Sequence, residues 1–166
     1  MATGDAFIAE LKHEAALTQK MLERVPLDKK DWKAHEKSMS VGRLATHIAE
    51  TIKWISTIRH IDDFDFLKDF NFNQQVASSQ EELMEMFQTN LDNALADLAA
   101  MTEEDYQKIW TVRRGAQVMM QLPKKVAIRG WAFSHQVHHR GQLSVMLRLL
   151  DIPVPGMYGP SADERG

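Results

Sequence analysis

The feature that most constrains the fold is a helical repeat: in four long stretches, apolar side chains recur every three or four residues, the spacing of one face of an α-helix. The predicted helices cover about Asp5–Arg24, Val41–His60, Gln80–Ala100 and Pro123–Leu150. Val25-Pro26 ends the first, because a residue that precedes proline disfavours the helical conformation. Ser40 and Ser79 stand where N-capping side chains are expected. No strand alternates with these helices, so we predict an all-α fold, a four-helix bundle.

The connection between the third and fourth helices has a different character. Two β-prone runs flank Arg114-Gly115 within Ile109–Met120, which predicts a small hairpin that packs on the helices. The segment Asp62–Gln75 is polar and aromatic, and we expect it to be a loop. A chain of 166 residues can bury one full core, so residues 1–166 are predicted to form a single domain.

Composition excludes several kinds of function. The chain has no cysteine, so disulfides, thiolate ligands and a cysteine nucleophile are ruled out, and any thiol chemistry needs a thiol cosubstrate. The formal net charge is −3, whereas nucleic-acid-binding domains usually carry a basic patch. The chain does not begin with a cationic and apolar leader. No apolar run approaches the roughly 20 residues that cross a membrane. We therefore expect a cytoplasmic protein without nucleic-acid or membrane partners.

Histidines give the strongest functional signal. His135 and His139 are four residues apart, which places them one turn apart on one largely apolar face of the predicted fourth helix. His47 lies beside an apolar stripe of the second helix. A buried polar group without a partner costs about 1–3 kcal/mol, so these rings need either hydrogen-bond acceptors or a metal ion. The pattern favours one divalent ion held by His47, His135 and His139, with a further position left open as in catalytic zinc sites.

Two other kinds of metal site do not fit. The zincin motif requires a glutamate after the first histidine, and Gln136 stands there. A di-iron bundle requires two Glu-x-x-His motifs, and only Glu10 with His13 fits. His138 lies about 60° around the helix from His135 and is predicted to be a neighbour of the site, not a ligand. A mononuclear site with three histidines remains.

Around these histidines the chain resembles the DinB-like family of metal-binding four-helix bundles, which includes YfiT-type proteins. The resemblance spans nearly the whole chain and rests on the segments Trp32–Ser40, Leu44–Glu50, His135–Leu143 and Pro153–Glu164. It implies a bundle that binds one divalent ion, usually nickel or zinc, through His47, His135 and His139, and that often forms homodimers. Related enzymes use low-molecular-weight thiols, including bacillithiol and mycothiol, and one branch isomerises maleylpyruvate. Many members have no assigned reaction.

Three hypotheses follow for the function. The leading one is a metal-dependent transferase in which a low-molecular-weight thiol cosubstrate is ionised at the metal and attacks an electrophile. The alternatives are a metal-dependent hydrolase that uses a bound water and a non-catalytic metal-binding protein. Glu50, one turn from His47, is predicted as the catalytic base or as an acceptor behind the ligand, unless it is simply a solvated helix residue. Trp54 and Trp131 are expected either in the core or in the pocket wall.

The opposite side of the fourth helix leads to a prediction about assembly. Val126, Gly130, Phe133, Val137 and Ser144 fall near one line on the side away from the histidines. Such a line either lies under another element or forms an interface. Together with the resemblance, it predicts a homodimer that packs these helices across a two-fold axis.

Overall fold

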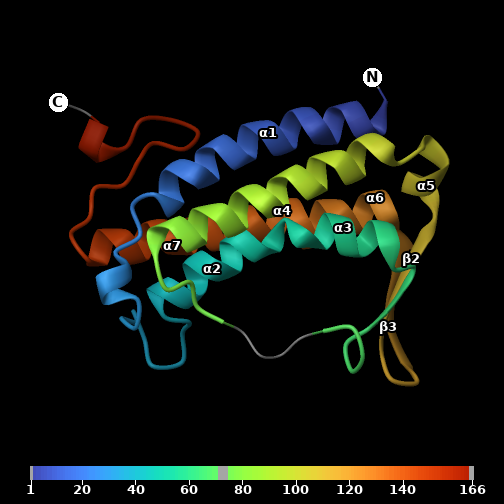
Figure 1. Cartoon of the computed structure of the whole chain (residues 1–166), viewed down its shortest axis with the longest axis horizontal. Helices are drawn as coiled ribbons and strands as arrows, with labels where there is room; N and C mark the ends of the chain where they lie inside the picture. The colour runs from blue at the N-terminus through green and yellow to red at the C-terminus, as the bar shows by residue number, and fades with distance from the viewer. Residues whose placement is uncertain (1, 71–74, 165–166) are drawn as a thin grey trace.

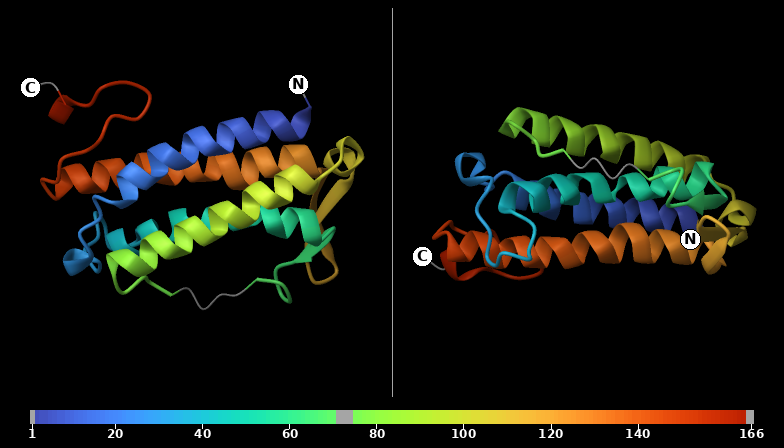
Figure 2. Two further views of the ribbon diagram at one scale, coloured as in Figure 1. Left: turned by 45° about the horizontal axis from the view of Figure 1, so that its top comes forward. Right: turned by 90° about the horizontal axis from the view of Figure 1, so that it is seen from below.

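In the computed structural model, which describes residues 2–70 and 75–164, four helical rods lie side by side (Figures 1 and 2). The rods are α1 (Thr3–Leu22), α2 with α3 (Val41–Thr51 and Lys53–His60), α4 (Gln80–Ala100), and α6 with α7 (Lys124–Ile128 and His135–Leu149). A 3-10 turn at Leu27–Lys29 and the helix α5 (Glu103–Gln107) lie in the connections between rods, and a second 3-10 turn, Ala162–Glu164, follows the last rod. The prediction of a mainly helical bundle is confirmed, and the predicted helix ends lie within about a turn of the observed ones.

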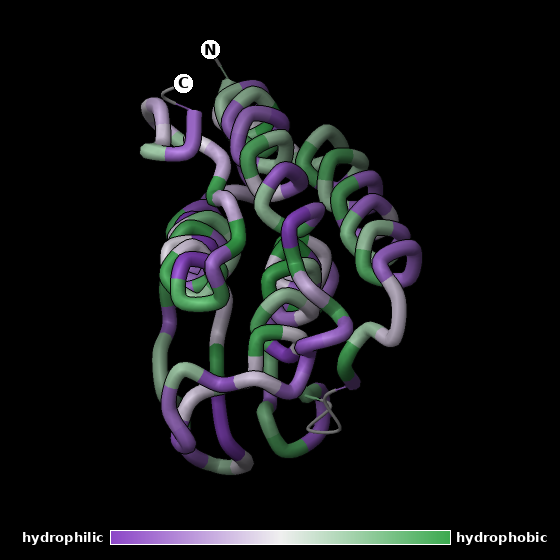
Figure 3. The backbone as a smooth tube through the Cα atoms, turned by 90° about the vertical axis from the view of Figure 1, so that its left-hand side faces the viewer, coloured by the Kyte–Doolittle hydropathy of each residue, from purple (hydrophilic) through white to green (hydrophobic). Residues whose placement is uncertain are grey.

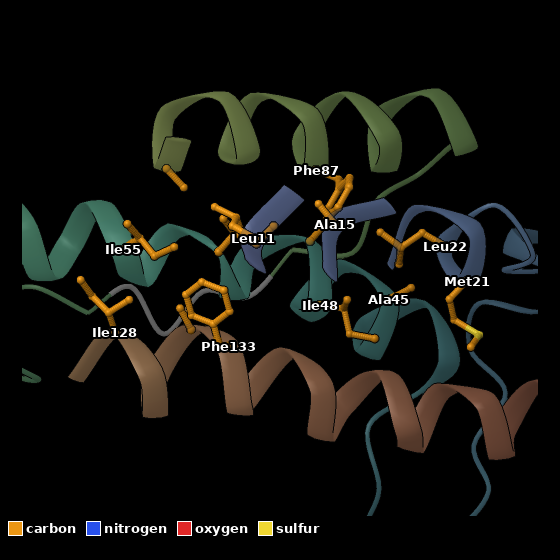
Figure 4. Packing of buried hydrophobic residues seen from close by; sticks show 14 of the residues in the cluster. Leu11, Ala15, Met21, Leu22, Ala45, Ile48, Ile55, Phe87, Ile128 and Phe133 are labelled. Carbon is orange, nitrogen blue, oxygen red and sulfur yellow. The ribbon is translucent and has the colours of Figure 1, made fainter. Parts of the chain in front are cut away.

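The core lies where the apolar faces of the four rods meet. Figure 3 views the rods nearly end-on, and Figure 4 shows their side chains interdigitating between the ribbons. Leu11, Ile48, Ile55, Phe87 and Ile128 each come from a different helix, and all are buried. Burying an aliphatic or phenyl side chain of this size contributes about 1.5–3 kcal/mol, so this shared core holds the rods in register.

The second rod is predicted as one helix and is observed as two. Ser40 caps α2 by accepting a hydrogen bond from the backbone N–H of Arg43, and α2 gives way to α3 at Ile52. The Thr51 hydroxyl donates to the carbonyl of Ile48 at 2.7 Å. A threonine that bonds back to its own helix competes with the helical ladder and tends to bend it. The interruption is local, because Ile52 keeps helical dihedral angles.

The fourth rod contains a segment that periodicity cannot reveal. Between α6 and α7, residues Arg129–Ser134 form a π-helix. A π-helical turn closes hydrogen bonds from i to i+5 and therefore takes one residue more than an α-helical turn. The residues of α6 and α7 thus do not share a single 100° wheel, although the rod remains continuous.

A three-stranded sheet at one end of the bundle confirms the hairpin and adds a strand (Figure 1). Strands β2 (Ile109–Arg114) and β3 (Gln117–Pro123) are antiparallel, and the turn between them uses a positive φ at Gly115. The predicted loop Asp62–Gln75 is wrong in its first part, because β1 (Asp63–Asp65) pairs parallel with β2. The carboxylate of Asp65 accepts hydrogen bonds from the backbone N–H of Gly115 and of Leu67, which holds β1 beside the hairpin. Residues 71–74 of that predicted loop lie outside the described residues.

The prediction of an interface along one line of the fourth helix is wrong for its central residue, Phe133. Phe133 is buried, and its ring stacks against Phe7 of α1 with centroids 5.5 Å apart. The prediction failed because a helix in a bundle packs against two neighbours, so a second flank of it is also covered. Val126 is exposed and Val137 is half-buried. The homodimer itself stays a prediction. Within residues 2–70 and 75–164, none of the helices is long and apolar enough to span a membrane.

Candidate metal centre

Three histidines from two rods converge at one point between α2 and α7. His47 of α2 and His135 and His139 of α7 each offer a ring nitrogen, and these atoms lie within 4.8 Å of one another. The Nε2 atoms of His47 and His135 are 3.2 Å apart. The three pairs of ring centroids are separated by 4.6–5.0 Å. The structure thus brings together all three residues that the sequence predicted as ligands.

The backbone around His135 helps to orient its ring. In a regular α-helix the N–H of His135 would bond to the carbonyl of Trp131, four residues earlier. At the end of the π-helix it bonds instead to the carbonyl of Ala132. The Trp131 carbonyl lies 3.2 Å from Nδ1 of His135. Since a carbonyl only accepts hydrogen bonds, the proton of this ring is on Nδ1 and the lone pair is on Nε2, which faces His47.

The ring of His139 is also held from behind, and Glu50 lies near that of His47. Nδ1 of His139 donates to Oε1 of Gln142 at 2.8 Å, which again leaves the lone pair on Nε2. Nδ1 of His47 lies 4.0 Å from Oε2 of Glu50, and the same oxygen pairs with Arg43 at 2.8 Å. Metal-binding histidines usually have such a partner on the second nitrogen, which fixes the tautomer and the direction of the ring.

Burial keeps the three imidazoles neutral at physiological pH. It lowers the pKa of His47 from 6.5 to about 4, and the nearby His139, His135 and Arg43 contribute to this shift. Burial is also the main reason why the pKa values of His135 and His139 are lowered. Neutral imidazole is the form that binds metals, so the site is ready to accept a cation without first losing protons.

These residues fit a divalent ion. Nitrogen ligands about 2.1 Å from a tetrahedral ion lie about 3.4 Å apart, close to the 3.2 Å between the two Nε2 atoms. The donor set suits zinc and nickel alike and does not choose between them.

The remaining histidines stay apart from this centre. His138 is exposed, although its ring packs 5.0 Å from that of His139. His13 and His35 are exposed on the surface, and His60 pairs with Asp97 at the far end of α3. Within the part of the chain that the structure describes, His47, His135 and His139 form the one cluster of three or more potential ligands.

A cavity of about 240 Å³ opens on the His47 side of the centre. Its lining residues are Arg43, His47, Glu50, Thr51, Lys53, Trp54, Thr57, Phe64, Asp69 and Phe70. Trp54 therefore lies in the cavity wall, which is one of the two alternatives predicted for it. Trp131 packs behind Trp54, with ring centroids 4.8 Å apart.

Glu50 also lines the cavity, so its carboxylate is accessible to a ligand. Sequence reasoning missed Phe64 and Phe70, although the phenylalanines of the predicted loop were a signal.

A second polar cluster lies on another side of α7. The guanidinium of Arg140 is 2 % exposed and donates to the carbonyl of Glu14 and the hydroxyl of Thr18, both at 3.0 Å. It also pairs with the Glu14 carboxylate at 2.6 Å and contacts the hydroxyl of Tyr158. Sequence reasoning missed this cluster. Arg140 and Tyr158 belong to segments that carry the family resemblance, which shows that those segments encode packing as well as ligands.

Comparison with known proteins identifies the family and agrees with the fold. The family model for the DinB family matches residues 1–165. The chain belongs to the DinB family. A curated relative, the uncharacterized protein YrdA of Bacillus subtilis (strain 168), is 25 % identical over 162 residues, which cover 98 % of this chain and 92 % of YrdA.

Solved structures resemble this DinB-family protein over most of their length. A DinB-like protein of Bacillus cereus ATCC 10987 matches with a TM-score of 0.72 and 23 % identity, covering 93 % of this chain and 97 % of its own. The DinB-like protein YjoA of Bacillus subtilis matches with a TM-score of 0.67 and 20 % identity, covering 88 % and 94 %. At these identities the likeness extends to the fold alone.

Proposed function

We propose that this protein binds one divalent ion, nickel or zinc, through His47, His135 and His139 and is a transferase that activates a low-molecular-weight thiol. The observation that carries the proposal is the convergence of neutral imidazole nitrogens beside an open cavity. A closed structural zinc site has four protein ligands, whereas the cluster here has three. The missing fourth ligand leaves a position for a substrate.

The donor set favours an anionic ligand such as a thiolate. A divalent ion held by three neutral ligands keeps its full charge and lowers the pKa of a thiol at its open position. The chain has no cysteine, so the thiol comes from a cosubstrate. In the proposed reaction, the thiol sulfur forms a bond to an electrophilic carbon, and the leaving group departs with the electron pair of its own bond to that carbon. The products are a thioether and the protonated leaving group.

Glu50 is the proposed acceptor of the thiol proton. It lines the cavity, and its pairing with Arg43 holds the carboxylate in place on the His47 side of the centre. Glu50 pairs with Arg43 through Oε2, and the 4.0 Å from this oxygen to Nδ1 of His47 is too long for a direct hydrogen bond, so Oε1 is the atom proposed to accept the proton. Glu50→Gln should therefore keep the metal and lower the turnover number.

Metal analysis tests the first part of the proposal. Purified protein loaded with nickel or zinc should hold one ion per chain by elemental analysis, and His47→Ala, His135→Ala and His139→Ala should lose it. His138→Ala is the matched control, because this exposed histidine is next to a ligand and outside the cluster. Full metal content in the His135→Ala and His139→Ala variants would contradict the assignment.

Turnover tests the second part. The loaded protein is incubated with a panel of thiols, including glutathione, bacillithiol and mycothiol, and an alkylating electrophile, and thioether formation is followed by mass spectrometry. We expect a product that requires the metal, a thiol and an intact Glu50. Release of the leaving group without incorporation of a thiol would instead support the hydrolase, and no turnover with any thiol would leave a metal-binding protein without this activity.

A further inference from the structure

Part of the cavity wall is aromatic. Trp54 of α3, Phe64 of β1 and Phe70 contribute rings from three separate segments. The ring of Trp54 lies 5.2 Å from that of Phe64 at 70°, and 6.4 Å from that of Phe70 with only 13° between the planes. The chain thus places aromatic surfaces in two orientations in the wall of the cavity that His47 also lines.

These rings are held firmly from behind. Trp54 packs edge-on against Trp131 at 4.8 Å and against Trp110 at 6.3 Å. Trp110 is fully buried. A wall that is already fixed loses little conformational entropy when a ligand stacks on it, and this favours binding.

The size of the cavity limits the ligand to one ring. An apolar cavity of about 150 Å³ holds a benzene molecule. The 240 Å³ found here therefore accommodates a single six-membered ring with a short substituent. A fused aromatic system would extend into solvent.

The fixed charges around the cavity nearly cancel. Arg43 and Lys53 are cationic, Glu50 and Asp69 are anionic, and Arg43 is already paired with Glu50. The wall itself therefore does not demand a charged ligand. Its aromatic surface selects by shape and by ring stacking, since aromatic pairs gain free energy beyond the area they bury.

We propose that this cavity binds the aromatic ring of the electrophile, so that the substrate class is an uncharged arylmethyl compound with a leaving group on its benzylic carbon. This inference rests on the proposed thiol transferase function and names its second substrate. With its ring against the aromatic wall at Trp54, the ligand keeps its short substituent within the cavity that His47 also lines. The thiol sulfur then bonds to the benzylic carbon, the leaving group takes the bonding electrons, and the thiol proton passes to Glu50.

Unreactive mimics test the ring site without turnover. Benzyl alcohol and cyclohexylmethanol have the same substituent and similar size, and they differ in whether the ring is flat and aromatic. Ligand-observed NMR titration of metal-free and zinc-loaded protein should show benzyl alcohol bound about 3- to 10-fold more tightly. Trp54→Leu should abolish this preference while metal content stays at one ion per chain. Trp32→Leu is the matched control, because Trp32 does not line the cavity.

The outcomes separate this inference from the proposed function. Equal binding of the two alcohols to the wild type, or a full aromatic preference in Trp54→Leu, would overturn it. If Trp54→Leu does not fold, Phe70→Leu gives the same comparison from the other wall. Preferential binding of benzyl alcohol without thiol turnover would refute the transferase function and support the aromatic site. Thiol turnover without preferential binding of benzyl alcohol would support the transferase function and refute the aromatic site.

Discussion

Two sides of the same helix use buried polar groups in opposite ways. On the side of α7 that faces α2, His135 and His139 direct ring nitrogens at His47. On the side that faces α1, Arg140 donates to four acceptors supplied by Glu14, Thr18 and Tyr158. The histidine cluster is incomplete in the sense that a bound ion can complete it. The Arg140 cluster is completed by the chain, which itself supplies the acceptors for the buried guanidinium.

The difference shows how a structural polar cluster can be told from a ligand site. Burial of Arg140 is offset within the protein, because its charge meets a carboxylate and its N–H groups meet oxygens. The Nδ1 atoms of His135 and His139 face outward to Trp131 and Gln142, and their rings gather with that of His47 so that one nitrogen of each can reach a common point. Convergent ring nitrogens can hold a cation, whereas a matched set of donors and acceptors holds helices together.

The largest effect should come from breaking the completed cluster. Arg140→Met leaves the Glu14 carboxylate buried without its partner, and losing one partner of a buried ion pair typically lowers the free energy of unfolding by about 3–5 kcal/mol. Urea unfolding of the metal-free protein measures this. Arg148→Met is the control, because Arg148 pairs with Asp163 on the surface and should contribute at most about 1 kcal/mol.

A double variant sharpens this prediction. Arg140→Met combined with Glu14→Leu removes both charges and should recover much of the lost stability. Metal content should remain at one ion per chain in both variants if the two sides of α7 are independent. Loss of metal in a folded Arg140→Met protein would show that the clusters are coupled.

A smaller effect is expected from protonation of the incomplete cluster. The pKa of His47 is about 4 in the folded protein, against 6.5 for a solvated histidine, so the unfolded chain takes up this proton first as the pH falls. The stability contributed by neutral His47 is full above about pH 6.5, decreases as the pH falls toward 4, and levels off below that. Between pH 7.5 and pH 4.5 the loss should be about 2–3 kcal/mol. Unfolding of the metal-free protein at pH 7.5 and pH 4.5 gives the value for wild type.

The variant His47→Gln isolates the contribution of His47. The carboxyl groups titrate in both proteins, so their effect on stability cancels when the variant is compared with wild type. Its decrease in stability over the same pH range should be smaller than that of wild type by about 2–3 kcal/mol. His35→Gln, which changes an exposed histidine, should behave like wild type. Identical pH profiles for wild type and His47→Gln would contradict the lowered pKa.

The smallest effect should come from loosening one ligand without removing it. Gln142→Ala takes away the acceptor for Nδ1 of His139. Loss of such a partner typically weakens metal binding about 10- to 100-fold, and the low end is expected because Gln142 is exposed. Competition with a chromophoric chelator measures the affinity. Gln142→Glu keeps an acceptor and should bind at least as tightly as wild type, so equal weakening in both variants would argue against this role.

Much of the bundle and the ligand set could be predicted because those signals are local. Helical spacing indicated the four rods, and the caps at Ser40 and Ser79 are set by neighbouring residues. His135 and His139 are also a local pair on one helix. His47 was predicted as the third ligand because it lies beside an apolar stripe of its own helix. That prediction required only that both helices face the same core.

The features that were missed depend on contacts between distant segments. Strand β1 pairs with β2 about 50 residues away, and Arg113 ties the two with bonds to Asp63. Glu14 and Arg140 are 126 residues apart. Nothing near either residue signals the partner. The cavity wall likewise arises only when α3 and β1 are brought together, so the aromatic residues of Asp62–Gln75 look like part of a loop when taken in sequence.

The π-helix at Arg129–Ser134 has a consequence for how this chain tolerates insertions and deletions. On one side of it, the buried Lys124 anchors α6 to Asp62 and to the carbonyl of Arg59. On the other side, Arg140 anchors α7 to α1. Removing one residue between these anchors would turn one end of the rod relative to the other by about 100°. Either the sheet end or the histidine pair would then face the wrong way, so we expect the length of this segment to be conserved more strictly than its side chains.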